Sequence, residues 1–143
     1  MTDVRRTITV QQPADKVVAY LKDFSNSEQW DPGTITTKRV GNGPVEVGSA
    51  WKNVSEFRGR KTELEYRLTR AESRRLTFVG ENKTATSTDD LTFRDIEGGT
   101  EIEYHAHFEF HGLAKLATPF LKGPLEKLGD DTEQQMRKTI NAL

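Results

Sequence analysis

The sequence predicts an α+β fold in which a long C-terminal helix lies across a curved antiparallel sheet of seven strands. Over residues 112–143, apolar residues recur at steps of three or four, the spacing that lines one side of an α-helix. Between residues 34 and 110, apolar and polar residues alternate in short runs separated by turns, which is typical of consecutive antiparallel strands with one sheltered face. The apolar side of the helix needs an apolar partner, and the sheet provides it.

Before the sheet proper, the sequence predicts one strand and two short helices. Alternation over residues 4–10 indicates the strand. Pro13 suits the first turn of a helix, where its missing N–H breaks no hydrogen bond. Apolar residues at i, i+3, i+4 and i+7 then predict an amphipathic helix over residues 13–22. Residues 24–30 are expected to add one or two helical turns, capped by Asp23 or Ser25.

Six further strands are predicted over residues 34–40, 49–58, 61–70, 75–80, 85–94 and 100–110. The pair Gly98-Gly99 is typical of a tight hairpin before the last of them. Pro119 and Pro124 interrupt the first half of the C-terminal helix. We therefore expect a bent or broken first part and a straighter part from about residue 124.

Size and composition restrict the classes of function. A chain of 143 residues is sufficient for one domain, and nothing in residues 1–143 resembles a linker. There are no cysteines, which excludes disulfides and thiolate metal sites. Lys and Arg, 21 in total, balance 22 Asp and Glu without a basic run, so no nucleic-acid partner is expected. Without a signal-like or membrane-spanning apolar run, we expect a cytoplasmic protein with no stable membrane insertion.

A set of residues distributed along the chain carries a family resemblance: Pro13, Val17, Val18, Asp23, Phe24, Trp30, Asp31, Pro32, Gly48, Trp51, Gly59, Arg60, Gly98, Gly99, Thr100, Gly112 and Leu113. In this order they resemble the START-like (SRPBCC) superfamily, in particular its bacterial polyketide cyclase/dehydrase and lipid-transport branch. The resemblance implies a helix-grip fold, in which the sheet wraps around the C-terminal helix and encloses a cavity for an apolar or amphipathic ligand. Members include lipid carriers, polyketide cyclases and hormone receptors, so the resemblance implies no single chemistry.

The inward faces of the predicted strands and helix define a candidate ligand cavity. An apolar wall with a few convergent polar groups is typical of small-molecule sites. The candidate cavity residues are Trp30, Trp51, Asn53, Ser55, Leu64, Tyr66, Leu68, Phe78, Asp89, Leu91, Tyr104, Phe108, Leu116 and Phe120. A filled core, with its polar groups satisfied by neighbours near the strand ends, is the alternative interpretation.

Asp89 is the most informative of these candidates, because an inward carboxylate needs a partner or a raised pKa. Arg6, also predicted to point inward, could supply that partner, and the sequence favours a structural ion pair or a position at the rim over a functional role for Asp89. The chain has no Gly-x-Ser-x-Gly elbow and no cysteine nucleophile, so its catalytic residues stay unknown. An enzyme would have to use cavity groups such as Tyr66, Tyr104, Asp89, Asn53 or Ser55.

The histidines raise the question of a metal site. His105, His107, Glu109 and His111 share one face of the last predicted strand, and a His-x-His pair on a strand can chelate zinc. This face is opposite the aromatic face and therefore points to solvent, and one strand cannot close all four groups around a single ion. The sequence predicts no metal site and no cofactor.

The leading hypothesis is a protein, monomeric or homodimeric, that binds a hydrophobic or amphipathic, lipid- or polyketide-like molecule between the sheet and the C-terminal helix. One alternative is an enzyme of the polyketide cyclase/aromatase kind. Another is a protein-interaction module of the same fold, whose sheet edge or outer face engages a partner.

Overall fold

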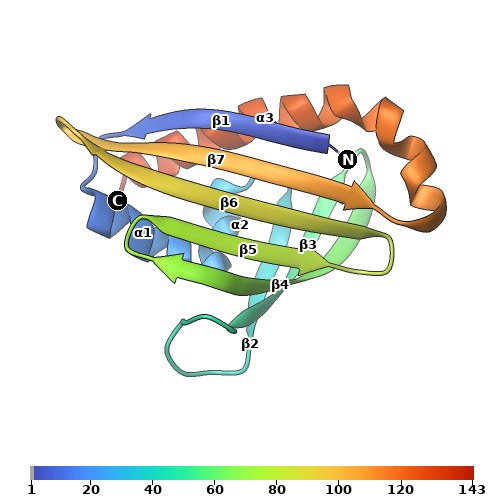
Figure 1. Cartoon of the computed structure of the whole chain (residues 1–143), viewed down its shortest axis with the longest axis horizontal. Helices are drawn as coiled ribbons and strands as arrows, with labels where there is room; N and C mark the ends of the chain where they lie inside the picture. Colours follow the sequence, from blue (N-terminus) through green and yellow to red (C-terminus); the bar gives the residue numbers. More distant parts are fainter. Residues whose placement is uncertain (1) are drawn as a thin grey trace.

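The computed structural model describes residues 2–143, which form one seven-stranded antiparallel sheet with a long helix along one side (Figure 1). The elements are β1 (Thr2–Val10), α1 (Ala14–Lys22), the 3₁₀ helix η1 (Phe24–Asn26), α2 (Ser27–Trp30), β2 (Thr34–Val40), β3 (Ala50–Phe57), β4 (Arg60–Glu72), β5 (Arg75–Glu81), β6 (Ala85–Ile96), β7 (Gly99–Phe110), the 3₁₀ helix η2 (Gly112–Ala117) and α3 (Thr118–Asn141). The predicted α+β class and helix-grip arrangement are confirmed. None of the described helices is long and apolar enough to span a membrane.

The sheet is a meander completed by the first strand. Strands β2 to β7 pair with their neighbours in sequence order, and β1 pairs with β7 at the far edge. Thr2 lies opposite Phe108 and Val10 opposite Thr100. Irregular pairing between Thr34 and Thr36, and again near Leu68, interrupts the ladders, and such bulges bend a sheet.

The short helices after β1 pack against the sheet, α1 against β5, β6 and β7, and η1 and α2 against β2. Helix α1 buries Ala14, Val17, Val18 and Leu21, the residues whose spacing predicted it. The Asp23 side chain then accepts a hydrogen bond of 3.0 Å from the backbone N–H of Ser25, which fixes the start of η1. This short 3₁₀ turn directs the Phe24 side chain into the interior, where it is buried.

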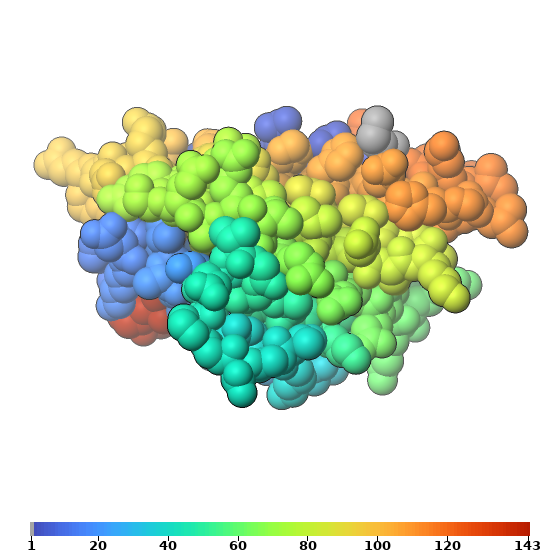
Figure 2. Space-filling model, turned by 60° about the horizontal axis from the view of Figure 1, so that its bottom comes forward, coloured from blue at the N-terminus to red at the C-terminus, as the bar shows by residue number. Residues whose placement is uncertain are grey.

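The C-terminal segment is broken at its start, as predicted, but the position of its first apolar residues differs from the prediction. Residues of η2 are not buried, and Leu113, Leu116 and Phe120 are 87%, 73% and 76% exposed. Figures 1 and 2 show why: this segment projects beyond the end of the sheet, which offers it no partner. The prediction that Leu116 and Phe120 face a cavity is therefore wrong.

Helix α3 packs against the core from about Leu121 onward. Its buried residues are Leu125, Gly129, Thr132, Met136 and Ile140. A Cβ atom at Gly129 would collide with Val4 and with the Arg6 guanidinium, so glycine allows the helix to approach β1 closely.

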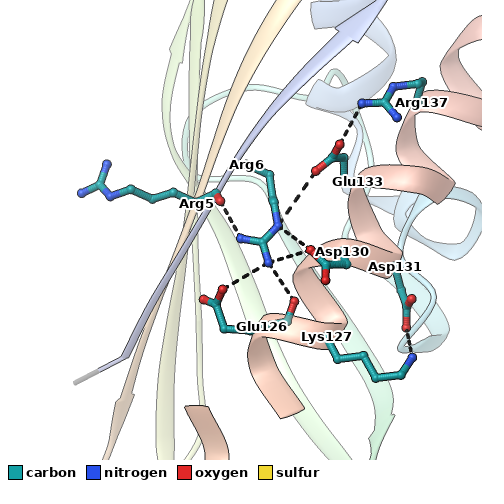
Figure 3. Close-up of polar contacts among 8 residues, drawn as sticks. All are labelled: Arg5, Arg6, Glu126, Lys127, Asp130, Asp131, Glu133 and Arg137. Atoms are coloured by element: carbon teal, nitrogen blue, oxygen red, sulfur yellow. Dashed lines mark hydrogen bonds and ion pairs between the residues drawn. The ribbon is translucent and has the colours of Figure 1, made fainter. Parts of the chain in front are cut away.

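Arg6 attaches β1 to this part of α3 (Figure 3). Its guanidinium donates to the Asp130 carboxylate (Nε–Oδ1, 3.0 Å) and to the backbone carbonyl of Glu126 (2.8 Å). It also forms ion pairs with the side chains of Glu126 (3.3 Å) and Glu133 (3.9 Å). The prediction that Arg6 could pair with Asp89 is therefore wrong, because acidic groups on α3 surround the guanidinium.

We expect Arg6→Ala to lower the free energy of unfolding by about 1–2 kcal/mol, because it removes these charge-assisted hydrogen bonds. The loss is modest because the acidic partners are partly exposed and solvent screens their charges. Arg5→Ala is the matched control, since Arg5 is exposed on the opposite face of β1 and should change stability by less than about 0.5 kcal/mol. Urea denaturation measures both variants. Equal losses would mean that the Arg6 contacts do not stabilise the protein.

Candidate ligand cavity

The space between the sheet and the helices is divided into a filled part and an open part. In the filled part, the Phe24 ring centroid lies 4.7 Å from that of Phe78 and 4.5 Å from that of Tyr66. Trp51 and Trp30 complete this aromatic group, at 6.1 Å and 6.0 Å from Phe24. The aromatic core therefore packs around the Phe24 side chain, which is provided by η1.

Five predicted cavity residues belong to this filled core and do not line the cavity: Trp30, Trp51, Leu68, Phe78 and Leu91. They point inward, but Phe24 and the residues of α1 occupy the space in front of that end of the sheet. The sequence predicts which face of each strand is sheltered. It contains no signal for the position along that face at which the filled core ends and the cavity begins.

The open part is a cavity of about 170 Å³ between the sheet and α3. Seven predicted residues line it: Asn53, Ser55, Leu64, Tyr66, Asp89, Tyr104 and Phe108. Residues that the sequence analysis did not select also line it, among them Val4, Asp31, Thr62, Ser87, Ala106, Phe110, Leu121, Leu125, Leu128 and Thr132. The helix residues could have been found, because Leu121, Leu125 and Leu128 follow the i, i+4, i+7 spacing of a single face.

Asp89 places a carboxyl group in the cavity wall. The residue is 5% exposed, and within residues 2–143 no side chain forms a hydrogen bond with its carboxylate. Burial raises the pKa of Asp89 from 3.8 to about 7, and the nearby charge of Asp31 adds to the increase. This group therefore changes its protonation state near neutral pH while facing the cavity.

Asp31 is the second carboxyl group of the cavity, and its environment differs from that of Asp89. It follows α2, and its side chain accepts hydrogen bonds of 3.0 Å from the backbone N–H of Gly33 and from the Thr34 hydroxyl. Burial raises the pKa of Asp31, and these two donors oppose the increase. Because two close carboxylates repel, ionised Asp31 disfavours ionisation of Asp89.

Tyr66 and Tyr104 add two phenol groups beside these acids. Burial raises the pKa of both phenols well above the usual value of 10.0, and the negative charge of Asp89 makes a second, smaller contribution. Both therefore stay protonated at neutral pH and can donate hydrogen bonds. A Cβ atom at Gly80 on β5 would collide with the Tyr66 ring, so glycine makes room for that ring.

Asn53 lines the cavity, but its amide group is engaged with β2. Its Nδ2 donates to the hydroxyl oxygens of Thr34 (3.0 Å) and Thr37 (2.9 Å). Asn53 therefore holds β2 and β3 together, and the Asp89, Tyr66 and Tyr104 side chains are the polar groups better placed to meet a ligand.

The comparisons with known proteins agree with this architecture. Residues 1–140 match the family described as polyketide cyclase / dehydrase and lipid transport. No curated protein matches the sequence.

Three solved structures illustrate the structural similarity. A protein from Thermus thermophilus superposes with a TM-score of 0.81 at 12% identity, covering 98% of this chain and 97% of that one. The Zhui aromatase/cyclase of a Streptomyces species gives 0.75 at 14% identity, covering 98% and 91%. A STAR-related lipid transfer protein from Xanthomonas axonopodis gives 0.73 at 14% identity, covering 95% and 84%. At these identities the similarity shows the fold.

Proposed function

Because the chain belongs to the polyketide cyclase / dehydrase and lipid transport family, we propose that it binds a hydrophobic or amphipathic small molecule between the sheet and α3. The observation that carries this proposal is the cavity itself, whose wall combines apolar side chains from both layers with the Asp89 carboxyl and two phenols. Such a wall buries an apolar body and orients a polar group. The names of the similar structures, an aromatase/cyclase and a lipid transfer protein, are consistent with a polyketide- or lipid-like ligand.

The volume of the cavity limits the size of the ligand that it can enclose. A volume of about 170 Å³ is smaller than the roughly 300–1,000 Å³ of pockets that hold drug-sized ligands. This suits one or two fused aromatic rings, or a short acyl chain, better than an entire long-chain lipid. A longer ligand would have to extend out of the cavity.

The projecting segment, made of η2 and the first turn of α3, supports a route for such a ligand. Leu113, Leu116 and Phe120 are exposed and lie between Phe110 and Leu121, which both line the cavity. An exposed apolar surface next to a cavity wall is typical of a place where an apolar molecule binds before it enters.

We expect Ala106→Leu to weaken ligand binding at least tenfold, because Ala106 is buried in the cavity wall and a larger side chain there fills the space. Glu109→Leu is the matched control, since it adds the same side chain to the exposed face of the same strand. Thermal shift with naphthols, medium-chain fatty alcohols and aromatic polyketides selects a ligand, and isothermal titration calorimetry measures its affinity.

Two results would contradict the proposal. In one, no compound of the panel raises the melting temperature of the unaltered protein. In the other, Ala106→Leu and Glu109→Leu bind the selected ligand with equal affinity.

One observation favours a second candidate function, an enzyme of the cyclase/aromatase kind. A cavity carboxyl with a pKa of about 7 can both accept and donate a proton near neutral pH, and the neutral phenols of Tyr66 and Tyr104 can donate hydrogen bonds to a carbonyl oxygen. In this case Asp89→Asn removes turnover of an aromatic polyketide precursor while binding of the precursor persists. An unchanged product profile would remove Asp89 from the mechanism.

A further inference from the structure

The face of the sheet opposite the cavity brings three metal-ligating side chains together from two strands. His105 and His107 are two residues apart on β7, so their side chains lie on the same face. Strand β1 runs beside them, with Asp3 opposite His107 in the antiparallel register. Asp3 is far from the two histidines in sequence, and only the pairing of β1 with β7 makes it their neighbour.

The donor atoms of these side chains already converge. The Nε2 atom of His105 lies 2.7 Å from Oδ1 of Asp3, and the Nδ1 atom of His107 lies 2.8 Å from the same oxygen. One ligand atom from each residue lies within 4.8 Å of the other two. The two rings are nearly perpendicular, at 74°, so their nitrogens approach the carboxylate from different directions.

We propose that Asp3, His105 and His107 form a binding site for a divalent transition-metal ion such as Zn²⁺, outside the ligand cavity and independent of it. Two imidazoles and one carboxylate are a donor set that zinc, copper and nickel accept. Three protein ligands on an open surface leave the fourth tetrahedral position for water.

The required movement is small. Metal–nitrogen and metal–oxygen bonds of about 2.0–2.2 Å in a tetrahedron place the ligand atoms about 3.4 Å apart. The present separations of 2.7 and 2.8 Å therefore have to increase by about 0.6 Å, from hydrogen-bonding distance to the distance across an ion. All three side chains are partly exposed and free to rotate by this amount.

The charges around the three ligands do not oppose a cation strongly. Arg5 is opposite His105 on β1, and its side chain extends away from the sheet into solvent (Figure 3). On the other side of His105 lies Asp90 of β6, whose carboxylate is paired with Arg75 at 2.8 Å. Arg5 therefore places a positive charge beside the site, where solvent screens it, and Asp3, a ligand itself, supplies a negative charge.

The sequence alone led to the opposite expectation for a physical reason. The sequence pattern groups His105, His107, Glu109 and His111 on a single strand, which cannot close all four groups around one ion. The structure replaces that set: His111 turns to the Thr86 hydroxyl, 2.9 Å from its Nε2, and Asp3 enters from the neighbouring strand.

The test uses the full chain without a histidine tag, treated with EDTA and then exchanged into metal-free buffer. We expect one equivalent of ZnCl₂ to raise the melting temperature, and Co²⁺ to give the visible absorption of a tetrahedral site. His105→Ala and His107→Ala are each expected to reduce Zn²⁺ affinity, measured by calorimetry, at least tenfold. His111→Ala is the matched control and is expected to bind as the unaltered protein does.

The proposal is overturned if stoichiometric metal changes neither the melting temperature nor the cobalt spectrum. It is also overturned if all three alanine variants retain the affinity of the unaltered protein, or lose it equally. Circular dichroism of each variant verifies that the fold is intact, and Asp3→Asn provides a second test, because it keeps the shape of the carboxylate while removing its charge.

Discussion

Asp89→Asn is expected to stabilise the protein by about 4 kcal/mol above pH 7 and to leave its stability near pH 4 almost unchanged. Each pKa unit corresponds to about 1.4 kcal/mol, so a carboxyl pKa raised from 3.8 to about 7 corresponds to about 4 kcal/mol. The buried carboxylate is the unfavourable form, and asparagine keeps the shape without the charge. Near pH 4 the protonated carboxyl group and the asparagine amide are both neutral, and the substitution removes no side-chain hydrogen bond within residues 2–143, so the stability changes little.

The direction of the pH dependence follows from proton counting. Between about pH 4 and pH 7 the folded protein keeps the proton on Asp89, while the unfolded chain has released it. Stability therefore decreases as the pH rises through this window and becomes level above it. Urea denaturation at intervals from pH 4 to pH 8 measures the difference between the two proteins.

Asp90→Asn is the neighbouring control and should behave in the opposite way. Hydrogen bonds from Arg75 lower the pKa of Asp90, so its carboxylate stabilises the fold above its unfolded pKa and this contribution disappears as the pH falls. The Asp90→Asn variant is therefore less stable than the unaltered protein at pH 7. If Asp89→Asn had the same stability as the unaltered protein at pH 8, Asp89 would not be buried without a partner.

Phe78→Ala is expected to lower the free energy of unfolding by about 3–5 kcal/mol. Its side chain is 1% exposed, and its ring centroid lies 4.7 Å from that of Phe24 and 5.9 Å from that of Trp51, so truncation leaves a hole in the filled core. The matched control is Phe108→Ala, where the ring borders the cavity and fewer contacts are lost.

For Phe108→Ala we expect a loss of about 1–2 kcal/mol, together with weaker ligand binding. Guanidinium denaturation measures both losses under the same conditions. Equal destabilisation by the two variants would show that the space beside Phe108 is as tightly packed as the space beside Phe78, and that no cavity separates the sheet from α3.

The fold was largely predictable, because the spacing of apolar residues in each strand and helix indicates which of its faces is buried. Alternation located every strand, and the spacing of Ala14, Val17, Val18 and Leu21 located α1. The same reasoning failed for Leu116 and Phe120, because an apolar stripe shows which side of a helix is suited to burial and not how far its partner extends.

The candidate site was predictable only in part, for a similar reason. Alternation placed Tyr66, Asp89 and Tyr104 on the inward face, where they line the cavity. It could not show that Phe24 fills the other end of the same face, since a single side chain on a short 3₁₀ turn has no periodicity. Contacts between strands that are distant in sequence, such as Asp3 with His105, depend on the order of the strands in the sheet. Local sequence patterns therefore do not predict them.

The position of β1 has a consequence for how the protein forms. Its residues pair with β7, Thr2 with Phe108, and Arg6 contacts α3. During synthesis on the ribosome, β1 is made before β7 and α3, so its backbone groups find these partners only after those elements have been made. Pairings so distant in sequence raise the contact order, which slows folding and leaves the nascent β1 accessible to chaperones until β7 has been synthesised.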